Sequence, residues 1–184
     1  MNSESVSCRY GPGPYVENGV LTRNDRVRVL GRDVSGQWLL VNFESEAGEA
    51  RSCWVESRPM DLAGADPAAL ENYYPGKYTL PLWEDYQPPA NVRTSRLENF
   101  VDIRWDDANL LELTQRESSR SPRFILEAWV CRDGVLGFII LGVVDNTSLI
   151  VEDQPGCTVP SSGLLYSAGK QGYSDPVNLL WPAP

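Results

Sequence analysis

Residues 101–105 of the chain, Val-Asp-Ile-Arg-Trp, alternate strictly between apolar and charged side chains. A period of two places alternate side chains on one face of a strand, so Val101, Ile103 and Trp105 are expected to face a core. Residues 26–30, Arg-Val-Arg-Val-Leu, repeat the pattern with both valines on one face. Both halves of the chain therefore predict half-buried strands, and the fold class that follows is all-β.

Turn formers separate these runs at short intervals. Gly11-Pro-Gly-Pro, Asp133-Gly and Pro155-Gly are clear examples, whereas helix signals are limited to residues 67–73. Short strands with frequent turns are typical of small barrels and sandwiches. The length of 184 residues is sufficient for two small domains that each bury a core. We therefore expect two β domains.

The composition excludes several classes of function. Lys and Arg number 16 against 25 Asp and Glu, and the resulting charge of −9 repels a nucleic-acid backbone. Histidine is absent, so the chain cannot form a serine triad, a Cys-His nucleophile or a His-ligated zinc site. A pair of carboxylates, as in glycosidases, stays possible in principle, but 25 acids supply such pairs by chance. We expect no enzyme, no cofactor and no nucleic-acid partner.

Two further expectations concern membranes and metals. The longest apolar run, residues 135–144, contains two glycines and falls well short of the roughly 20 residues of a membrane helix, so it predicts a buried strand pair. No EF-hand spacing occurs, and we expect no metal site. Four acids are the candidates for a surface calcium site: Asp106, Asp107, Asp145 and Asp153.

The four cysteines, Cys8, Cys53, Cys131 and Cys157, show no CxxC spacing, which disfavours a zinc ribbon or a redox motif. An even number of widely spaced cysteines is typical of disulfides in an oxidising compartment; free buried thiols in a cytosolic protein are the alternative. Three connectivities are possible. If the chain has two domains, only the pairing of Cys8 with Cys53 and of Cys131 with Cys157 keeps each bridge within one domain.

Residues 1–7 lack the features of a signal peptide, so we interpret the chain as the mature or trimmed form of a secreted or cell-surface protein.

Composition changes between residues 62 and 90, where prolines alternate with aromatic residues. A flexible linker would be rich in Gly and Ser, so we interpret this segment as a semi-rigid linker packed on one or both domains. An aromatic ladder that stacks on carbohydrate or peptide is the functional alternative. The predicted division is a first domain over residues 1–66, a linker over 67–87 and a second domain over 88–184.

Four blocks in the first half resemble the bacterial SH3-like domain, in the family's order and spacing. They are Arg9-Tyr-Gly-Pro-Gly-Pro-Tyr, Asn24-Asp-Arg-Val-Arg-Val-Leu-Gly, Gly36-Gln-Trp-Leu-Leu-Val and Cys53-Trp-Val. The resemblance implies a small barrel over residues 8–58 that binds cell-wall material or peptide. Cys8 and Cys53 fall on the first and last blocks, as a bridge within that domain requires.

Ligand residues vary among members of this family, so the binding site is predicted only from residue type and position. The candidates are Tyr10, Tyr15, Trp38 and Trp54. For the two tryptophans the alternative is a place in the core of the barrel.

The second half resembles a fibronectin type III domain. The resemblance rests on Pro89-Ala-Asn-Val, on the alternating strand at residues 101–105 and on Ala168-Gly-Lys-Gln-Gly-Tyr-Ser-Asp-Pro-Val, although Leu164 stands where a tyrosine is usual. Seven apolar runs over residues 88–184 suit an immunoglobulin-like sandwich with Trp105 in its core.

Two functional hypotheses follow, both for an extracellular, non-catalytic protein without a membrane span. In the first, the barrel binds a peptide or glycan of the bacterial cell wall and the sandwich acts as a spacer. In the second, the protein is a structural subunit of an extracellular assembly or surface layer and makes protein contacts only, with a homo-oligomer as one such assembly.

Overall fold

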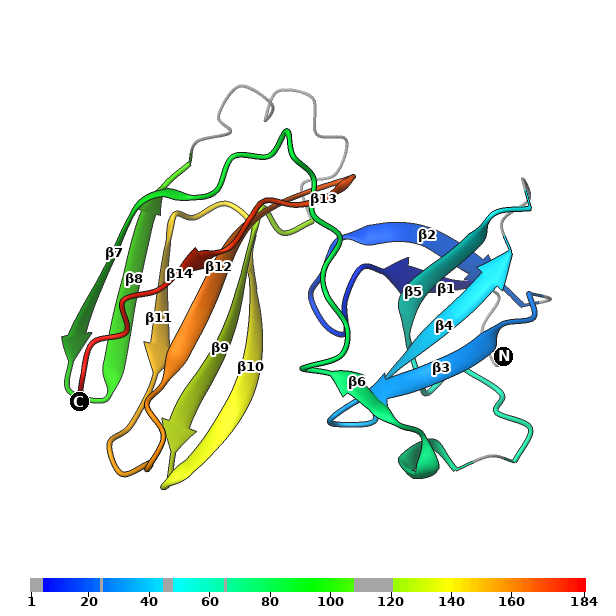
Figure 1. The fold of residues 1–184 in the computed structure, drawn as a ribbon, viewed down its shortest axis with the longest axis horizontal. Coiled ribbons are helices and arrows are strands. Elements are labelled where there is room, and N and C mark those ends of the chain that lie inside the picture. Colours follow the sequence, from blue (N-terminus) through cyan, green and yellow to red (C-terminus); the bar gives the residue numbers. More distant parts are fainter. Residues whose placement is uncertain (1–4, 24, 45–47, 65, 108–120) are drawn as a thin grey trace. The chain divides into compact units, whose positions relative to one another are not determined.

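The computed structural model describes residues 5–23, 25–44, 48–64, 66–107 and 121–184. Its contacts divide the chain into two compact units, Met1–Pro81 (unit 1) and Leu82–Pro184 (unit 2). Both units are built from β-strands, and the one helical element among the described residues is a three-residue 3-10 turn (Figure 1). The all-β fold class predicted from the alternating runs is confirmed.

Unit 1 contains a six-stranded sheet in the order β2-β1-β5-β4-β3-β6. Strands β3, β4 and β5 form an antiparallel meander, and β1 pairs with β2 on one side and with β5 on the other. The described ladders form an open order from β2 to β6, so the closed barrel stays a prediction. The strands are β1 (Ser5–Arg9), β2 (Glu17–Thr22), β3 (Arg28–Asp33), β4 (Trp38–Glu44), β5 (Ala50–Glu56) and β6 (Asn72–Tyr74).

The core of unit 1 forms because alternate residues of these strands are apolar. Its buried cluster comprises Val6, Cys8, Leu21, Leu39, Val41, Cys53 and Val55. The disulfide between Cys8 and Cys53 lies inside this cluster, with the two Cα atoms 5.4 Å apart. It joins the first strand of the unit to the last strand of the meander.

Part of the predicted linker belongs to unit 1. After the 3-10 turn η1 (Pro67–Ala69), β6 pairs with β3 in parallel and the Tyr74 side chain is buried. The close approach requires glycine at position 31, because a Cβ there would lie 2.8 Å from the carbonyl oxygen of Glu71. The sequence places the end of the first domain at residue 66, whereas the compact unit extends to Pro81.

Unit 2 is a sandwich of two antiparallel sheets. One sheet has the order β11-β8-β7, and the other has the order β10-β9-β12, with β13 and β14 both pairing with β12 (Figure 1). The fourth strand of the unit pairs with the third rather than joining the first sheet, which is the arrangement of a fibronectin type III-like sandwich. The strands are β7 (Ala90–Leu97), β8 (Phe100–Asp106), β9 (Phe124–Arg132), β10 (Val135–Val143), β11 (Ser148–Glu152), β12 (Ser162–Gly169), β13 (Gly172–Tyr173) and β14 (Val177–Asn178).

The alternating strand at residues 101–105 supplies the centre of the sandwich core, as predicted. Val101 and Ile103 are fully buried, and the Trp105 ring packs edge-on against Phe124 with a centroid distance of 5.1 Å. The second disulfide joins Cys131, at the end of β9, to Cys157 in the loop before β12, with a Cα separation of 5.8 Å. Each bridge therefore stays within one unit.

Candidate functional site

Unit 1 carries a hollow of about 530 Å³ between β1 and the end of β5. The described ladder between these strands consists of the pair Arg9 and Trp54. Beyond that pair β1 leads back to Ser5 and β5 leads on to Glu56, and the hollow lies between the two segments. Its lining residues are Ser5, Val6, Ser7, Arg9, Trp38, Glu56, Arg58 and Pro59.

The position of Trp38 in this hollow is set by the turn that precedes β4. The Trp38 backbone N–H donates to Oδ1 of the buried Asp33 at 2.8 Å, and Oδ2 of Asp33 accepts the backbone N–H of Ser35 at 3.0 Å. An aspartate that accepts backbone N–H groups two and five residues on fixes the local chain path. Trp38 is thereby held at the first position of β4 with its side chain half-buried.

Arg9 stands over the Trp38 ring, with its guanidinium carbon 5.6 Å from the ring centroid. Its Nη1 donates to the carbonyl oxygens of Gly13 at 3.1 Å and Tyr15 at 3.4 Å, and its Nη2 lies 3.4 Å from Oε1 of Glu17. These contacts hold the Gly-Pro-Gly loop against the strand. The arginine is therefore a structural support for the hollow as well as one of its two cations.

Glu56 and Arg58 supply opposite charges on the other side of the hollow. Glu56 is the residue directly opposite Trp38 in the β4–β5 ladder, so their side chains share one face of the sheet. Both Glu56 and Arg58 are exposed. The hollow thus combines an aromatic surface with two cations and one anion, which suits a polar, extended ligand that carries a carboxylate and an amine or amide.

The structure separates the four predicted ligand residues into two groups. Trp38 lines the hollow, and Tyr10 is half-buried in the adjoining loop. In contrast, Trp54 and Tyr15 are 0% and 1% exposed, so their rings pack inside unit 1. For Trp54 the core position that the sequence left as an alternative is the observed one.

Tyr15 and Trp54 belong to an aromatic cluster with two tyrosines of the predicted linker. Tyr74 lies edge-on to both rings, at centroid distances of 6.2 Å from Tyr15 and 6.0 Å from Trp54, and Tyr78 lies 5.5 Å from Trp54. The hydroxyl groups of Tyr15 and Tyr74 are 2.5 Å apart and share a hydrogen bond. Burial raises the pKa of Tyr78 to about 12, Tyr10 adds to the rise, and the Trp54 indole opposes it. These tyrosines bind the segment after η1 to the sheet rather than forming an exposed ladder.

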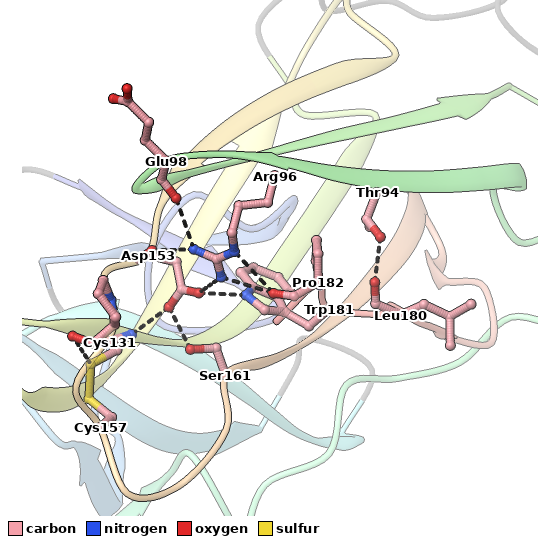
Figure 2. A network of polar contacts seen from close by, with 11 residues as sticks. Thr94, Arg96, Glu98, Cys131, Asp153, Cys157, Ser161, Leu180, Trp181 and Pro182 are labelled. Carbon is pink, nitrogen blue, oxygen red and sulfur yellow. Dashed lines mark hydrogen bonds and ion pairs between the residues drawn. A yellow bond between two sulfur atoms is a disulfide. The ribbon is translucent and has the colours of Figure 1, made fainter. Parts of the chain in front are cut away.

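One end of unit 2 holds a dense polar network around Asp153, which is 2% exposed (Figure 2). Oδ1 of Asp153 accepts the backbone N–H of Cys131 at 2.8 Å and the Ser161 hydroxyl at 2.5 Å. Oδ2 accepts the Trp181 indole N–H at 2.9 Å and forms an ion pair with Arg96. Burial alone would raise the pKa of Asp153, but these four donors outweigh it and hold the pKa below its ordinary value.

Arg96 is equally occupied, and its side chain is 10% exposed. Its Nη1 donates to the Asp153 carbonyl oxygen at 2.6 Å, and its Nε donates to the Pro182 carbonyl oxygen at 3.1 Å. Thr94 donates to the carbonyl oxygen of Leu180 from the same strand. A neighbouring cavity of about 280 Å³ is lined by Arg96, Asp153, Trp181 and Pro182 among others. The network ties the C-terminal segment to β7. Because Arg96 and Asp153 already pair with each other, it offers little to a ligand.

The four acids proposed for calcium are not all gathered at one place. Asp106 ends β8, whereas Asp153 donates its backbone N–H to the Asn99 carbonyl oxygen, just before β8 begins. The length of β8, about 20 Å, separates the two. In the part of the chain that the structure describes, no group of three or more His, Cys, Asp or Glu side chains is placed to hold a metal ion.

Within the same described residues, no helix is long and apolar enough to cross a membrane.

Arg58 and Glu56 are residues of the hollow that sequence reasoning missed. Their only signal in the sequence is that they follow the Cys53-Trp-Val block. Glu56 is the last residue of β5, and Arg58 comes just after that strand. The sequence also gave no sign of the Asp153 network, because its members come from β7, from the loop after β11 and from the chain's last residues.

Comparison with known proteins yields no family model and no curated protein that matches the chain. Among solved structures, the chain is similar to domains of titin, with 14% identity, a TM-score of 0.31 and coverage of 94% of this chain and 50% of that one. It is also similar to the FN1–FN3 domains of chicken CNTN1, with 10% identity, a TM-score of 0.34 and coverage of 89% and 70%. The chain spans about half the length of the titin chain. The assignment of unit 2 as a fibronectin type III-like sandwich therefore rests on its own strand order.

Proposed function

We propose that this protein is an extracellular, non-catalytic binding protein whose unit 1 is an SH3-like domain that holds a peptide or glycan of the bacterial cell wall. The binding site is the hollow beside Trp38. Unit 2 acts as a spacer that presents unit 1.

The order of elements in unit 1 supports the SH3-like assignment. The block that begins at Arg9 supplies the end of β1 and the loop after it, the block that ends at Gly31 runs into β3, and the other two blocks supply β4 and β5. The four blocks that carry the resemblance thus fall on β1, β3, β4 and β5, which are neighbours in one sheet.

The observation that carries the proposal is the composition of the hollow. A half-buried indole beside exposed charges of both signs is the kind of surface on which peptides and sugars are recognised, because the ring offers a flat apolar contact and the charges orient the ligand. The Asp33 turn fixes the Trp38 backbone, the Arg9 guanidinium lies over the Trp38 ring, and Arg9 is itself held by two carbonyl oxygens. Fixed groups bind more tightly because little side-chain entropy is lost when the ligand arrives.

Two disulfides support an extracellular location. Every cysteine of the chain is in a bridge, and each bridge lies in or beside a buried core. Such bridges persist in oxidising compartments and are rare in the cytosol.

The experiment is a sedimentation assay with purified bacterial cell walls. Trp38→Ala is expected to weaken retention at least about tenfold, since buried aromatic anchors account for ~2 kcal/mol or more at a binding site. Arg58→Glu reverses one exposed charge of the hollow and is expected to weaken retention as well. Trp83→Ala is the matched control, because Trp83 is a partly exposed tryptophan of unit 2.

Circular dichroism and unfolding curves must show that each variant is folded. Wild-type protein that stays in the supernatant contradicts wall binding. Equal retention of wild type and both hollow variants contradicts the assignment of the site.

A further inference from the structure

The two disulfides of the protein differ in their access to solvent. Cys8 and Cys53 are 1% and 0% exposed and lie inside the core cluster of unit 1. Cys131 is also buried, but its partner Cys157 is half-buried and stands on an exposed loop. Both cysteines of this second bridge line the cavity of about 280 Å³ in unit 2. A small reagent can therefore approach the second bridge, from the side of Cys157, in the folded protein.

The loop that carries Cys157 consists of residues 156–160, Gly-Cys-Thr-Val-Pro (the Cys157 loop). Its residues other than the cysteine are all exposed, and Val159 is 56% exposed. Among the hydrogen bonds and ion pairs of the described residues, none is made by the Cys157 loop. The disulfide is therefore the tether that fixes the middle of this loop to β9.

The chain on either side of the Cys157 loop is held by contacts that do not involve sulfur. Before the loop, the Gln154 backbone N–H donates to the Cys131 carbonyl oxygen at 2.8 Å, and the Gln154 side chain accepts the Asp133 backbone N–H at 2.9 Å. After the loop, the Ser161 hydroxyl donates to Asp153, which also accepts the Cys131 backbone N–H (Figure 2). Loss of the bridge thus leaves both ends of the loop in place and frees the residues between them.

We propose that the Cys131–Cys157 bridge is a reversible thiol-exchange site, which a small dithiol reduces in the folded protein and which thereby switches the Cys157 loop from a fixed to a mobile state. Exposed disulfides are the labile and regulatory ones, whereas buried structural disulfides resist reduction. The Cys8–Cys53 bridge, inside its core, is of the second kind. The site belongs to unit 2 and does not depend on wall binding by unit 1.

The exchange proceeds in two steps. One thiolate of the dithiol attacks Sγ of Cys157, so that a mixed disulfide forms and Cys131 leaves as a thiolate. The second thiolate of the dithiol then attacks the dithiol's own sulfur in the mixed disulfide, closes a cyclic disulfide and releases Cys157. Each cysteine takes up a proton, so the protein gains the two electrons and two protons that the dithiol loses. An oxidised dithiol restores the bridge by the reverse steps.

The structural effect of reduction is expected to be local. All five residues of the Cys157 loop line the cavity, so a mobile loop changes the shape of that cavity. The C-terminal segment is held by other elements, through the Arg96–Asp153 pair and the Trp181 hydrogen bond. Reduction therefore loosens one wall of the cavity while the sandwich keeps its fold.

The test treats the folded full chain with dithiothreitol, stops the reaction with an alkylating reagent at intervals and maps the alkylated cysteines by mass spectrometry. Cys131 and Cys157 are expected to be alkylated at least about tenfold faster than Cys8 and Cys53, because a buried bridge reacts only in molecules that have opened. Glutathione, a monothiol, should leave its adduct on Cys157 rather than on Cys131.

Limited proteolysis and amide exchange measure the state of the Cys157 loop. Elastase, which cleaves after small apolar residues, is expected to cut the reduced protein at Val159 and to leave the oxidised protein intact at the same dose. The Cys131 amide, which donates to Asp153, should stay protected in both forms. Reoxidation after removal of the dithiol should restore the resistance of the loop.

The matched controls are the two double variants that each keep one bridge. Cys8→Ala/Cys53→Ala should retain the fast reaction, and Cys131→Ala/Cys157→Ala should show only the slow one; the mapping of the wild type decides the matter where a variant does not fold. Equal rates at the two bridges overturn the proposal. A glutathione adduct on Cys131, loss of the Cys131 amide protection on reduction, or a reduced loop that stays resistant to elastase overturns it as well.

Discussion

A buried carboxylate such as that of Asp153 destabilises a fold unless its oxygens are occupied by donors. Asp153 has four donors, and the cation of Arg96 is one of them. The network joins the end of β9, the loop before β12 and the C-terminal segment. At the scale of single residues, we therefore expect a substitution of Asp153 to destabilise unit 2 more than the loss of any other polar side chain described above.

Asp153→Asn is expected to lower the free energy of unfolding by about 3–5 kcal/mol, because it leaves the buried Arg96 cation without its counter-charge. The folded-state pKa of Asp153 lies below its ordinary value of 3.8. Its contribution is therefore fully present above that pH and is lost as the pH falls through the lower folded-state pKa. Urea unfolding from neutral to acid pH measures both effects, and the variant should show the weaker acid destabilisation.

Asp102→Asn is the control for this prediction. Asp102 pairs with Arg104, whose side chain is 72% exposed. An exposed pair contributes less than about 1 kcal/mol. Similar losses in both variants would show that Asp153 has no special role.

At the scale of elements, the parallel pair of β3 and β6 decides where unit 1 ends. Gly31 allows β6 to lie against β3, and Tyr74 then reaches the aromatic cluster with Tyr15 and Trp54. The segment after η1 thus belongs to the sheet of unit 1, with β6 as its edge strand.

Gly31→Ala is expected to destabilise unit 1 by about 1–3 kcal/mol, since the new methyl group meets a backbone carbonyl that cannot move without breaking the β3–β6 pair. The matched control is Gly137→Ala on β10, where a Cβ meets nothing within 4 Å. That change should stabilise slightly, by about 0.5–1 kcal/mol. Thermal unfolding of the two variants checks the difference in sign.

Many of the strands could be predicted from the sequence, and those that could not have physical reasons. The strand at residues 101–105 is recognisable because its alternation matches the period of a half-buried strand. The β6 strand has three residues and a partner far away in the sequence, so no local pattern marks it. Trp38 and Trp54 look alike in sequence, since each is followed by apolar residues that predict a strand. Trp54 is a core residue because the rings of Tyr74 and Tyr78, which are distant in sequence, pack on it.

At the scale of the whole molecule, each of the two units has a disulfide of its own. Each disulfide closes within one unit, across 45 residues for Cys8–Cys53 and 26 for Cys131–Cys157. The cysteine spacing left three pairings open, and the observed pairing is the one that two independent domains require.

Removing one bridge is therefore expected to affect one unit only. The Cys8→Ala/Cys53→Ala variant should lose about 4 kcal/mol from unit 1, and the Cys131→Ala/Cys157→Ala variant about 3.5 kcal/mol from unit 2. Calorimetry of each variant should show one transition displaced and the other unchanged. Displacement of both transitions by one variant would mean that the units unfold together.

The hollow beside Trp38 could not be predicted from the sequence as a whole. Its walls come from both ends of unit 1, with Arg9 on the first strand and Arg58 after the fifth. Trp38 is recognisable as a candidate by its aromatic side chain, whereas the charged residues beside it stand in no pattern of their own. They become a site only because β1 and β5 pair at Arg9 and Trp54 and leave a space beyond.

The C-terminal segment of unit 2 is held through the carbonyl oxygens of Leu180 and Pro182, which any amino acid would provide. The side chains that do the holding are Arg96, Asp153 and Trp181, at separations of 57 and 28 residues. We therefore expect substitutions at Leu180 to keep these hydrogen bonds, whereas a change of Arg96, Asp153 or Trp181 removes a donor or acceptor of the network. An arginine and an aspartate 57 residues apart, followed by a tryptophan 28 residues later, form the spaced triplet that we expect relatives of low overall identity to share.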